Sequence, residues 1–265
     1  MTVFLAIICG ALVGFSLGLI GGGGSILATP MMLYVLGMPP HRAIGTSALA
    51  VSANAFLNFA SHARARTVRW APAALFAIVG ILGAYVGSTL GKALNGHKLL
   101  FLFAILMIVV GVLMLRPRGK GGDAERPLDF PMGARIVVAA LLVGAMSGFF
   151  GIGGGFLIVP GLVFATTMPM INAIGSSLLS VGTFGATTAV NYAISGLIDW
   201  PIAAEFVGGG LVGGLFGMML ALRLAHYRRA LNIVFSVLIF LVAIYMLWKN
   251  IHAFTHPAHA HHKHG

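Results

Sequence analysis

The stretch GLIGGGGSILATP, residues 18–30, reappears later in the chain as GFFGIGGGFLIVP, residues 148–160. The correspondence runs without an insertion from Gly18 to Trp70 and, 130 positions later, from Gly148 to Trp200. This period is far longer than the units that build solenoids, so we interpret the chain as one duplicated half. Each copy opens on a glycine cluster inside an apolar segment, which predicts a broken element at the same place in both halves.

The amino-acid composition indicates an integral membrane protein. Hydrophobic residues make up 59% of the chain, charged residues 8%, and the mean hydropathy is +1.00. A water-soluble globule of this length cannot cover so much apolar surface. Leu99 to Leu115 and Ile233 to Trp248 hold no charged residue and approach the roughly 20 apolar residues that a span needs. Apolar and polar residues do not alternate along these segments, which favours an all-α polytopic fold over a transmembrane β-barrel.

The formal net charge of +11 does not indicate a nucleic acid partner. The basic residues lie in short connections between apolar runs, where lipid headgroups account for them. Met1 to Ile20 lacks the basic leading region and the small-residue cleavage site of a signal peptide, so we expect it to form the first span. The expected partners are the lipid bilayer and a small anionic substrate, and the sequence leaves the oligomeric state open.

Five apolar segments are expected in each half. The predicted boundaries are 1–115 for a first membrane repeat, 116–134 for a hydrophilic linker, 135–250 for a second membrane repeat and 251–265 for a His-rich tail. The apolar segments lie at about 3–20, 25–38, 43–62, 70–91 and 99–115, and then at 136–150, 155–168, 173–196, 200–221 and 230–249.

The second segment of each half, 25–38 and 155–168, leaves two topologies open. Each is short, follows glycines that weaken a helix by ~1 kcal/mol apiece relative to alanine, and contains a proline, Pro30 or Pro160. If it crosses the bilayer, the chain has ten spans, most arginines share one side, and the odd number per half makes the repeat inverted. If it re-enters, eight spans result. The tendency of basic loops to stay cytoplasmic favours ten spans.

The glycine clusters form the first candidate substrate site. Consecutive glycines let the backbone unwind and approach a ligand, and the exposed amide hydrogens of a helix start attract an anion. The alternative is that glycines only permit close helix crossing. The residues expected to bind substrate are Gly21, Gly22, Gly23, Gly24 and Ser25, with Gly151, Gly153, Gly154 and Gly155 in the second half. Those assigned to packing are Gly10, Gly14, Gly18, Gly80, Gly83, Gly87, Gly208, Gly209, Gly210, Gly213 and Gly217.

The third segment of each half carries a polar stripe at helical spacing, which is the second candidate site. Hydroxyls and amides on one face of a span can donate hydrogen bonds to an oxyanion without adding charge to the membrane interior. Alternatively, they bond their own preceding turn or hold neighbouring helices together. The stripes are Ser47, Asn54, Asn58 and Ser61, and Ser176, Ser180, Thr183, Thr187 and Asn191. The predicted substrate ligands are Ser47, Asn54, Asn58, Ser177, Thr187 and Asn191.

Few ionisable residues lie within the spans. Glu205, about one turn inside the span that opens at Trp200, is a candidate for proton coupling; alternatively it lies near the interface or bonds a neighbouring helix. His62 and Arg64 end a span and are expected to reach the lipid headgroups, with a role in an anion vestibule as the alternative. No GxxxxGK[ST] or HExxH motif occurs, and no close pair of acids lies inside a span. We therefore expect neither an enzyme nor a cofactor, and no metal site.

The paired glycine motifs, the AIGTSAL and AIGSSLL stretches after MPP and MPM, and the tryptophan that opens each fourth segment resemble the TauE/SafE family of sulfite exporters. The resemblance covers nearly the whole chain. It implies a multi-pass transporter of a bacterial or archaeal cytoplasmic membrane that exports a sulfur-containing anion, either sulfite or an organosulfonate. One departure is that Ser25 stands where the second copy has Gly155.

These features together predict a secondary transporter with two inverted halves. The halves would enclose a small anion between their glycine-rich breaks near the bilayer midplane and expose it alternately to each side. A passive anion channel is the alternative, since the same breaks and polar stripe would suit it. A membrane scaffold without a transport role is disfavoured because no soluble domain is present.

Overall fold

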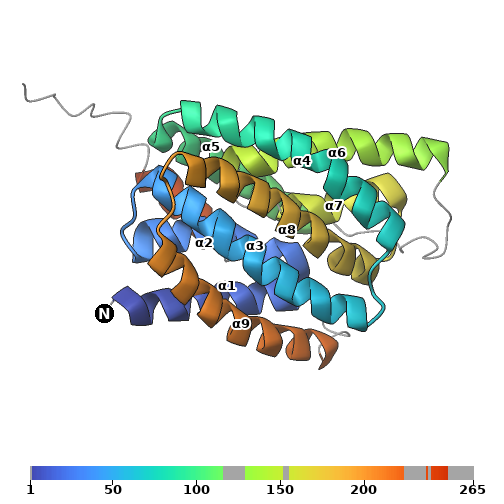
Figure 1. Ribbon diagram of the computed structural model, residues 1–265, viewed down its shortest axis with the longest axis horizontal. Coiled ribbons are helices and arrows are strands. Elements are labelled where there is room, and N and C mark those ends of the chain that lie inside the picture. The colour runs from blue at the N-terminus through green and yellow to red at the C-terminus, as the bar shows by residue number, and fades with distance from the viewer. Residues whose placement is uncertain (1, 116–128, 152–154, 224–236, 238–239, 250–265) are drawn as a thin grey trace, which may run out of the picture.

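The described part of the chain is helical throughout. The computed structural model describes residues 2–115, 129–151, 155–223, 237 and 240–249, and no strand occurs among them. The long helices lie side by side, and their axes are roughly aligned, parallel or antiparallel (Figure 1). Gly153, Gly154, most of the predicted linker and the His-rich tail lie outside the described residues.

The two halves contain matching elements. The first half has α1 (Thr2–Ile20), the 3₁₀ turn η1 (Gly21–Leu27), α2 (Ala28–Pro30), the π-helical η2 (Met31–Val35), α3 (Pro40–Arg64), α4 (Trp70–Ala93) and α5 (Gly96–Leu115). The second half has α6 (Phe130–Phe150), α7 (Gly155–Thr166), α8 (Met170–Ile194), α9 (Trp200–Arg223) and an apolar helix, Phe240–Lys249. The bounds of α8 and α9 repeat those of α3 and α4, so the sequence repeat is also a structural repeat.

Local chemistry sets where these helices begin. Proline has a fixed φ and needs no N–H partner, and Pro39 and Pro169 precede α3 and α8. The Asp129 carboxylate accepts a 2.9 Å hydrogen bond from the Met132 N–H and caps α6. The second half therefore begins earlier than the boundary at residue 135 that hydropathy predicted, because an average of hydropathy does not register a polar cap.

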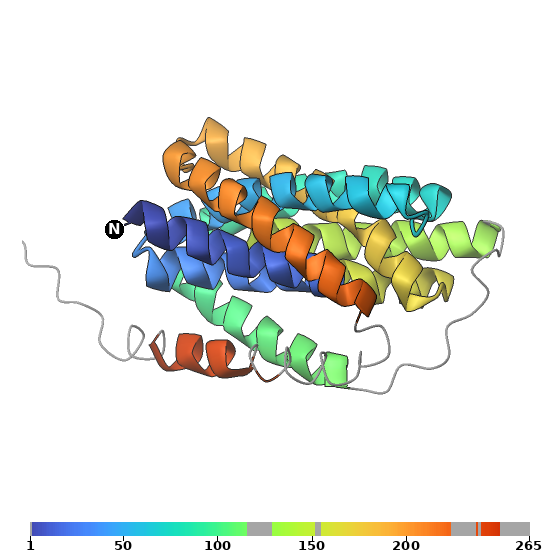
Figure 2. The ribbon, with the colours of Figure 1, turned by 90° about the horizontal axis from the view of Figure 1, so that it is seen from below.

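Each outer helix pair joins one helix from each half. α1 lies along α9, and α4 lies along α6 (Figures 1 and 2). The contacts are backbone to backbone: a Cβ atom on Gly14 would overlap the Gly210 carbonyl, and one on Gly87 would overlap the Ala145 carbonyl. Helices that approach this closely gain dispersion and weak polar contacts, which is the usual mode of packing in membranes.

The packing role predicted for the glycines is confirmed with one exception. Gly208 lies on the outward face of α9, where a Cβ atom would have nothing within 4 Å. Its prediction was wrong because sequence spacing does not reveal which face of α9 meets α1. A Cβ atom would clash with a neighbouring helix at Gly10, Gly14, Gly18, Gly80, Gly83, Gly87, Gly209, Gly210, Gly213 and Gly217.

The centre of the bundle is formed by α3 and α8, which are equivalent in the repeat and run antiparallel. Gly45, near the start of α3, lies against Tyr192, near the end of α8. Halfway along, the Ser52 hydroxyl donates a 2.7 Å hydrogen bond to the Gly182 carbonyl. The fifth helices also meet each other, since Gly111 of α5 lies against the ring of Phe240. The α1–α9 and α4–α6 pairs therefore flank a central antiparallel pair.

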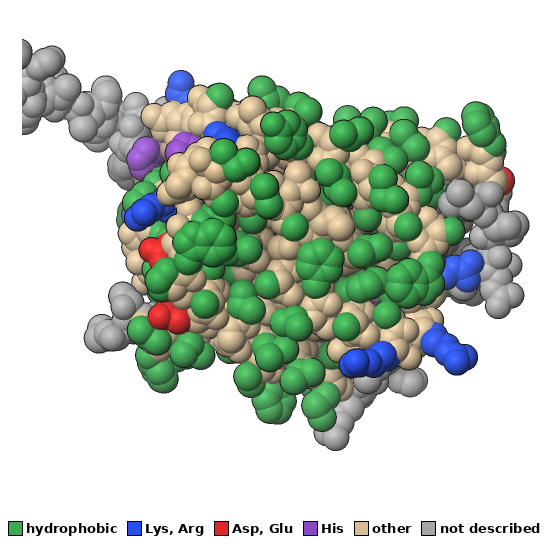
Figure 3. Space-filling model, in the orientation of Figure 1, with side chains coloured by type: hydrophobic (Ala, Val, Ile, Leu, Met, Phe, Trp, Pro, Cys, Tyr) green, Lys and Arg blue, Asp and Glu red, His purple; other side chains and the backbone are tan. Residues whose placement is uncertain are grey.

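Helix length and surface composition both fit a membrane protein. Apolar side chains cover the middle of the face seen in Figure 3, and charged side chains gather toward its two ends. This distribution suits helices that run between two headgroup layers. Among the described residues, five helices are long and apolar enough to cross a membrane: Pro40–Arg64, Trp70–Ala93, Phe130–Phe150, Ile171–Ile194 and Trp200–Leu220. Shorter apolar helices cover Val3–Leu19, Gly24–Val35, Gly96–Val109, Gly155–Thr166 and Phe240–Lys249.

We expect Gly209→Val to destabilise the fold and Gly208→Val, at the neighbouring position of α9, to leave it intact. A Cβ atom on Gly209 would overlap the Ile7 carbonyl of α1, whereas Gly208 faces open space. Overpacking of this kind costs about 1–3 kcal/mol. Size-exclusion chromatography of heated protein in detergent measures the difference. Equal unfolding temperatures for the two variants would contradict the backbone contact between α1 and α9.

Candidate functional site

Both glycine clusters turn the chain back at the end of a helix. After α1 the backbone tightens into η1, and Gly24 lies so close to α1 that a Cβ atom would overlap the backbone N of Leu17. After α6, Gly151 adopts φ +65°, a left-handed conformation that favours glycine, and its N–H donates a 3.1 Å hydrogen bond to the Gly148 carbonyl. Hairpin geometry therefore requires a glycine in both halves.

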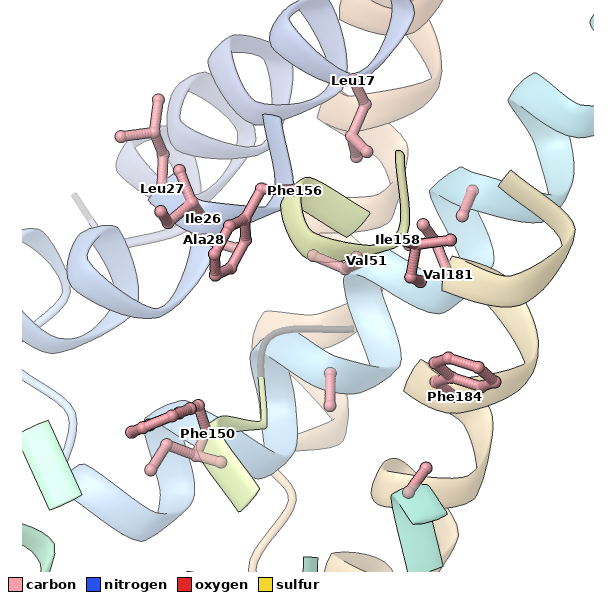
Figure 4. Packing of buried hydrophobic residues seen from close by; sticks show 14 of the residues in the cluster. Leu17, Ile26, Leu27, Ala28, Val51, Phe150, Phe156, Ile158, Val181 and Phe184 are labelled. Atoms are coloured by element: carbon pink, nitrogen blue, oxygen red, sulfur yellow. The ribbon is translucent and has the colours of Figure 1, made fainter. Parts of the chain in front are cut away.

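The segments that follow the two clusters pack against each other inside the molecule. η1 contacts α7, and the equivalent residues Ile26 and Phe156 are both buried there. Phe156 points toward Ile26 and Ala28, and the equivalent valines of α3 and α8, Val51 and Val181, belong to the same apolar core (Figure 4). The two breaks thus lie together, and apolar side chains make the contact between them.

The predicted glycine site is described only in part. Gly21, Gly22 and Gly23 lie in η1, and Gly153 and Gly154 lie outside the described residues. The buried members are Gly24, Ser25, Gly151 and Gly155.

Ser47 connects the first break to α3. Its hydroxyl donates a 3.0 Å hydrogen bond to the Ile44 carbonyl and lies 2.9 Å from the Thr29 Oγ1. Either hydroxyl can be the donor of this second bond. Sequence reasoning missed Thr29, although it stands beside Pro30 in the first glycine motif. These two hydroxyls fix α2 against α3, and both are fully buried.

Asn54 is the most unusual polar residue of the first stripe. Its side chain is fully buried against Gly210 of α9, and neither its Nδ2 nor its Oδ1 has a hydrogen-bond partner among the described residues. Asn58, one turn later, lies against Gly214 and donates a 2.9 Å bond to the Asn54 carbonyl. At the equivalent place in the second half, Phe184 lies against Gly80. A buried carboxamide without partners is rare in native proteins and calls for a functional explanation.

Two residues of the second stripe, Thr183 and Thr187, and the neighbouring Ser177 bond their own helix. The Ser177, Thr183 and Thr187 hydroxyls donate to the Ile174, Ser180 and Thr183 carbonyls at 2.8, 3.1 and 2.8 Å. These bonds match the alternative in which hydroxyls satisfy the preceding turn. Ser180 differs, because its buried hydroxyl has no hydrogen-bond partner in the part of the chain that the structure describes.

Asn191 is held by a network at the end of α4. Its Nδ2 donates to the hydroxyls of Ser88 and Thr89 at 2.6 and 3.0 Å. The Lys92 ammonium donates to the Asn191 Oδ1 and backbone carbonyl at 2.7 and 2.8 Å, and to the Ser195 hydroxyl at 2.9 Å. In this conformation the Asn191 carboxamide is therefore engaged between α4 and α8. Sequence reasoning missed Lys92, since nothing along the chain reveals its partner on α8.

The repeated AIGTS and AIGSS motifs connect the two halves. The Arg69 N–H donates a 2.9 Å hydrogen bond to the Ser176 hydroxyl, and the Asp199 N–H donates a 3.0 Å bond to the Thr46 hydroxyl. Arg69 and Asp199 directly precede α4 and α9. The motif of each half therefore orients the start of the fourth helix of the other half. The preceding glycines make room: a Cβ on Gly175 would lie 2.7 Å from the Thr67 Oγ1.

The ionisable residues occupy different environments. Glu205 is half-buried near the start of α9. Arg64 is exposed, but His62 is buried, with its Nδ1 2.9 Å from the Thr67 Oγ1, so the prediction that His62 reaches the headgroups was wrong. It turns inward because the loop after α3 folds back over it. Ser61 is half-buried. No group of His, Cys, Asp or Glu that could hold a metal occurs within the described ranges.

Comparison with known proteins identifies relatives along most of the chain. The family described as "Sulfite exporter TauE/SafE" matches residues 6–250. A "Probable membrane transporter protein" of Xylella fastidiosa (strain 9a5c) is 56% identical over 243 residues, 91% of this chain and 93% of that protein. "Probable membrane transporter protein YunE" of Bacillus subtilis (strain 168) is 26% identical over 273 residues, 95% of this chain and 99% of that protein. "Sulfite exporter TauE/SafE family protein 1" of Arabidopsis thaliana is 34% identical over 122 residues, 46% of this chain and 26% of that protein. No solved structure matches the chain.

We expect Ser176→Ala to lower stability and Ser177→Ala, its neighbour, to change it little. Ser176 accepts the bond from Arg69 of the other half, and its loss leaves a partly buried N–H unpaired, at a cost of up to about 1–3 kcal/mol. Ser177 donates only to its own helix. Thermal unfolding in detergent measures both, and a larger loss for Ser177→Ala would contradict the connecting role of the motif.

Proposed function

The chain belongs to the sulfite exporter TauE/SafE family, and we propose that it is a secondary transporter that exports a small sulfur-containing oxyanion by alternating access. Sulfite and organosulfonates are the proposed cargo, and the cytoplasmic membrane of a bacterium or archaeon is the proposed location. Membership of the family and the apolar helices already make it a multi-pass membrane transporter.

We propose ten spans arranged as an inverted repeat. The antiparallel packing of the equivalent helices α3 and α8 supports this arrangement, since equivalent helices of inverted halves point in opposite directions. The hairpins after α1 and α6 support a second segment that leads back across the bilayer. In the eight-span alternative, each second segment would instead enter and leave the membrane on the same face.

The helix pairs provide moving parts for alternating access. α1–α9 and α4–α6 are each held by backbone contacts without intervening side chains, so each pair is expected to move as one body. The breaks lie between these pairs, where Ile26 and Phe156 now close the contact (Figure 4). We propose that rocking of the two pairs about α3 and α8 opens this contact to one side and then to the other.

Asn54 is the observation that carries the site assignment. Its buried, unpaired Nδ2 can donate to an oxyanion without placing a fixed charge in the membrane, which suits transient binding. We propose that Asn54 and Ser180 bind the anion during the transition, together with the glycine-rich breaks. Ser47, Asn58 and Thr187 would support this site through the bonds described above.

We expect Asn54→Ala to reduce the saturable flux of sulfite into proteoliposomes by roughly tenfold or more, the value of one hydrogen bond to a charged group. The unfolding temperature should not fall by more than a degree or two, because the Asn54 carboxamide makes no bond that is lost. Ser52→Ala, on the same helix, is the matched control: it loses the bond to Gly182 and should reduce stability while keeping flux. Full flux in Asn54→Ala would remove Asn54 from the site.

The same proteoliposomes distinguish a transporter from a channel. Counterflow of labelled sulfite against unlabelled sulfite is expected for a transporter that alternates between two openings. Single-channel currents in planar bilayers, without counterflow, would instead establish a passive anion channel.

Coupling to protons is proposed through Glu205, because it is the acid that lies half-buried inside a described span. We expect Glu205→Gln to abolish the stimulation of flux by a pH gradient while flux driven by the substrate gradient remains. Asp199→Asn is the control, since asparagine keeps the cap on the Ile202 N–H at the start of α9. Unchanged pH stimulation in Glu205→Gln would exclude this residue from coupling.

A further inference from the structure

One end of the bundle contains an open recess of about 510 Å³. It lies between the starts of α3 and α5, at residues 39–42 and 95–97, and is closed on another side by Leu197 of the α8–α9 connection. Its volume is within the range of small-ligand sites, about 300–1,000 Å³. No residue of the glycine clusters or of the polar stripes lines it, so the recess is separate from the central site.

Among the lining residues, Arg42 carries a fixed positive charge. Arg42 and His97 are exposed at its rim, His41 is half-buried in its wall, and none of its lining residues is acidic. Behind it, the Tyr192 ring lies 6.4 Å from the His41 ring and 5.9 Å from the Lys92 ammonium. The oxygens that accept from Lys92 are all neutral. The surroundings of the recess therefore carry positive charge that these partners do not neutralise.

Backbone N–H groups at the start of α3 also lie beside the recess. The first hydrogen bond of α3 is donated by Ala43 to the Pro39 carbonyl at 2.8 Å, and no side chain caps this helix. The backbone N–H groups of His41 and Arg42 therefore lie ahead of the bonded part of α3, at the positive end of its dipole. Within the described ranges, the His41 Nδ1 in the wall and the Tyr192 hydroxyl on α8 are buried and have no hydrogen-bond partner.

The remaining walls of the recess are apolar. Pro39, Pro40 and Leu197 supply carbon surface next to the cationic rim. A bare inorganic oxyanion would leave this surface unused. An anion with both a charged oxyacid group and a short carbon group would occupy the rim and the wall together.

We propose that the recess binds an oxyanion that carries a short apolar group, and that it is the vestibule through which the transported anion enters or leaves the bundle. The transport role rests on the proposed function, whereas binding does not. Arg42 and the backbone N–H groups at the start of α3 bind the oxyacid group, His97 completes the rim, and the two prolines contact the carbon group.

Binding of butanesulfonate and of sulfate to purified protein in a neutral detergent tests the recess directly. We expect saturable binding of butanesulfonate, weaker binding of sulfate, and a roughly tenfold higher Kd for butanesulfonate in Arg42→Gln. Lys98→Gln is the matched control, because it removes the same charge from the adjoining turn of α5 at a residue that does not line the recess. Equal Kd values for the two variants, or no saturable binding to the unaltered protein, would overturn the proposal.

Transport measurements then separate this inference from the proposed function. We expect Arg42→Gln to raise the KM for butanesulfonate flux about tenfold with little change in maximal rate, and Lys98→Gln to leave both unchanged. Flux that is insensitive to Arg42→Gln would overturn the vestibule and leave the transporter intact. Arg42-dependent binding without any flux would leave the recess as a binding site and overturn the transporter.

An anionic lipid headgroup has the same chemistry as the proposed ligand. The last experiment therefore measures butanesulfonate binding in nanodiscs of phosphatidylcholine with and without phosphatidylglycerol. We expect butanesulfonate to bind in both. Two results together would identify an anionic lipid as the ligand and overturn the vestibule. Butanesulfonate would bind in neither kind of nanodisc, and native mass spectrometry would show phosphatidylglycerol retained by Lys98→Gln but not by Arg42→Gln.

Discussion

Close contact between helix backbones is the constraint on which this structure depends. In lipid the apolar side chains of a helix gain nothing by leaving the solvent, so helices associate through dispersion and weak polar contacts at short range. Gly10, Gly14 and Gly18 of α1 and their neighbours in α9 bring the two backbones together, and α4 and α6 do the same. Any side chain larger than hydrogen at these positions would separate the helices.

This packing joins the two halves of the repeat into one unit. α1 packs mainly against α9 of the second half, and α4 packs against α6, which also belongs to the second half. Neither half can therefore cover its glycine faces alone. The bonds from Arg69 to Ser176 and from Asp199 to Thr46 repeat the same exchange at the ends of the central helices. A duplicated chain in which each half completes the other provides two equivalent helix pairs around a central antiparallel pair.

Within this scaffold the two halves differ where function is expected. Asn54 and Phe184 occupy equivalent positions and lie against the equivalent glycines Gly210 and Gly80. One presents an unpaired carboxamide and the other a stacked ring, which lies 6.2 Å from Phe76. The cationic recess at the start of α3 has the same one-sided character, because its counterpart in the second half begins MPMIN instead of MPPHR. The duplication repeats the helical framework, whereas single residues such as Asn54 and Phe184 differ between the halves.

The sequence by itself determined the helical membrane class, the repeat, its family and the packing role of most glycines, because composition and spacing are properties of the chain alone. Hydropathy placed helix ends to within a few residues, except where the Asp129 cap moved the start of α6. Only the tertiary structure decided which polar groups are engaged. Thr187 bonds its own turn, Asn191 is held by Lys92, His62 turns inward and Asn54 stays unpaired. A hydrogen bond depends on which helix crosses at that height, and no local pattern records the neighbour that folding brings into contact.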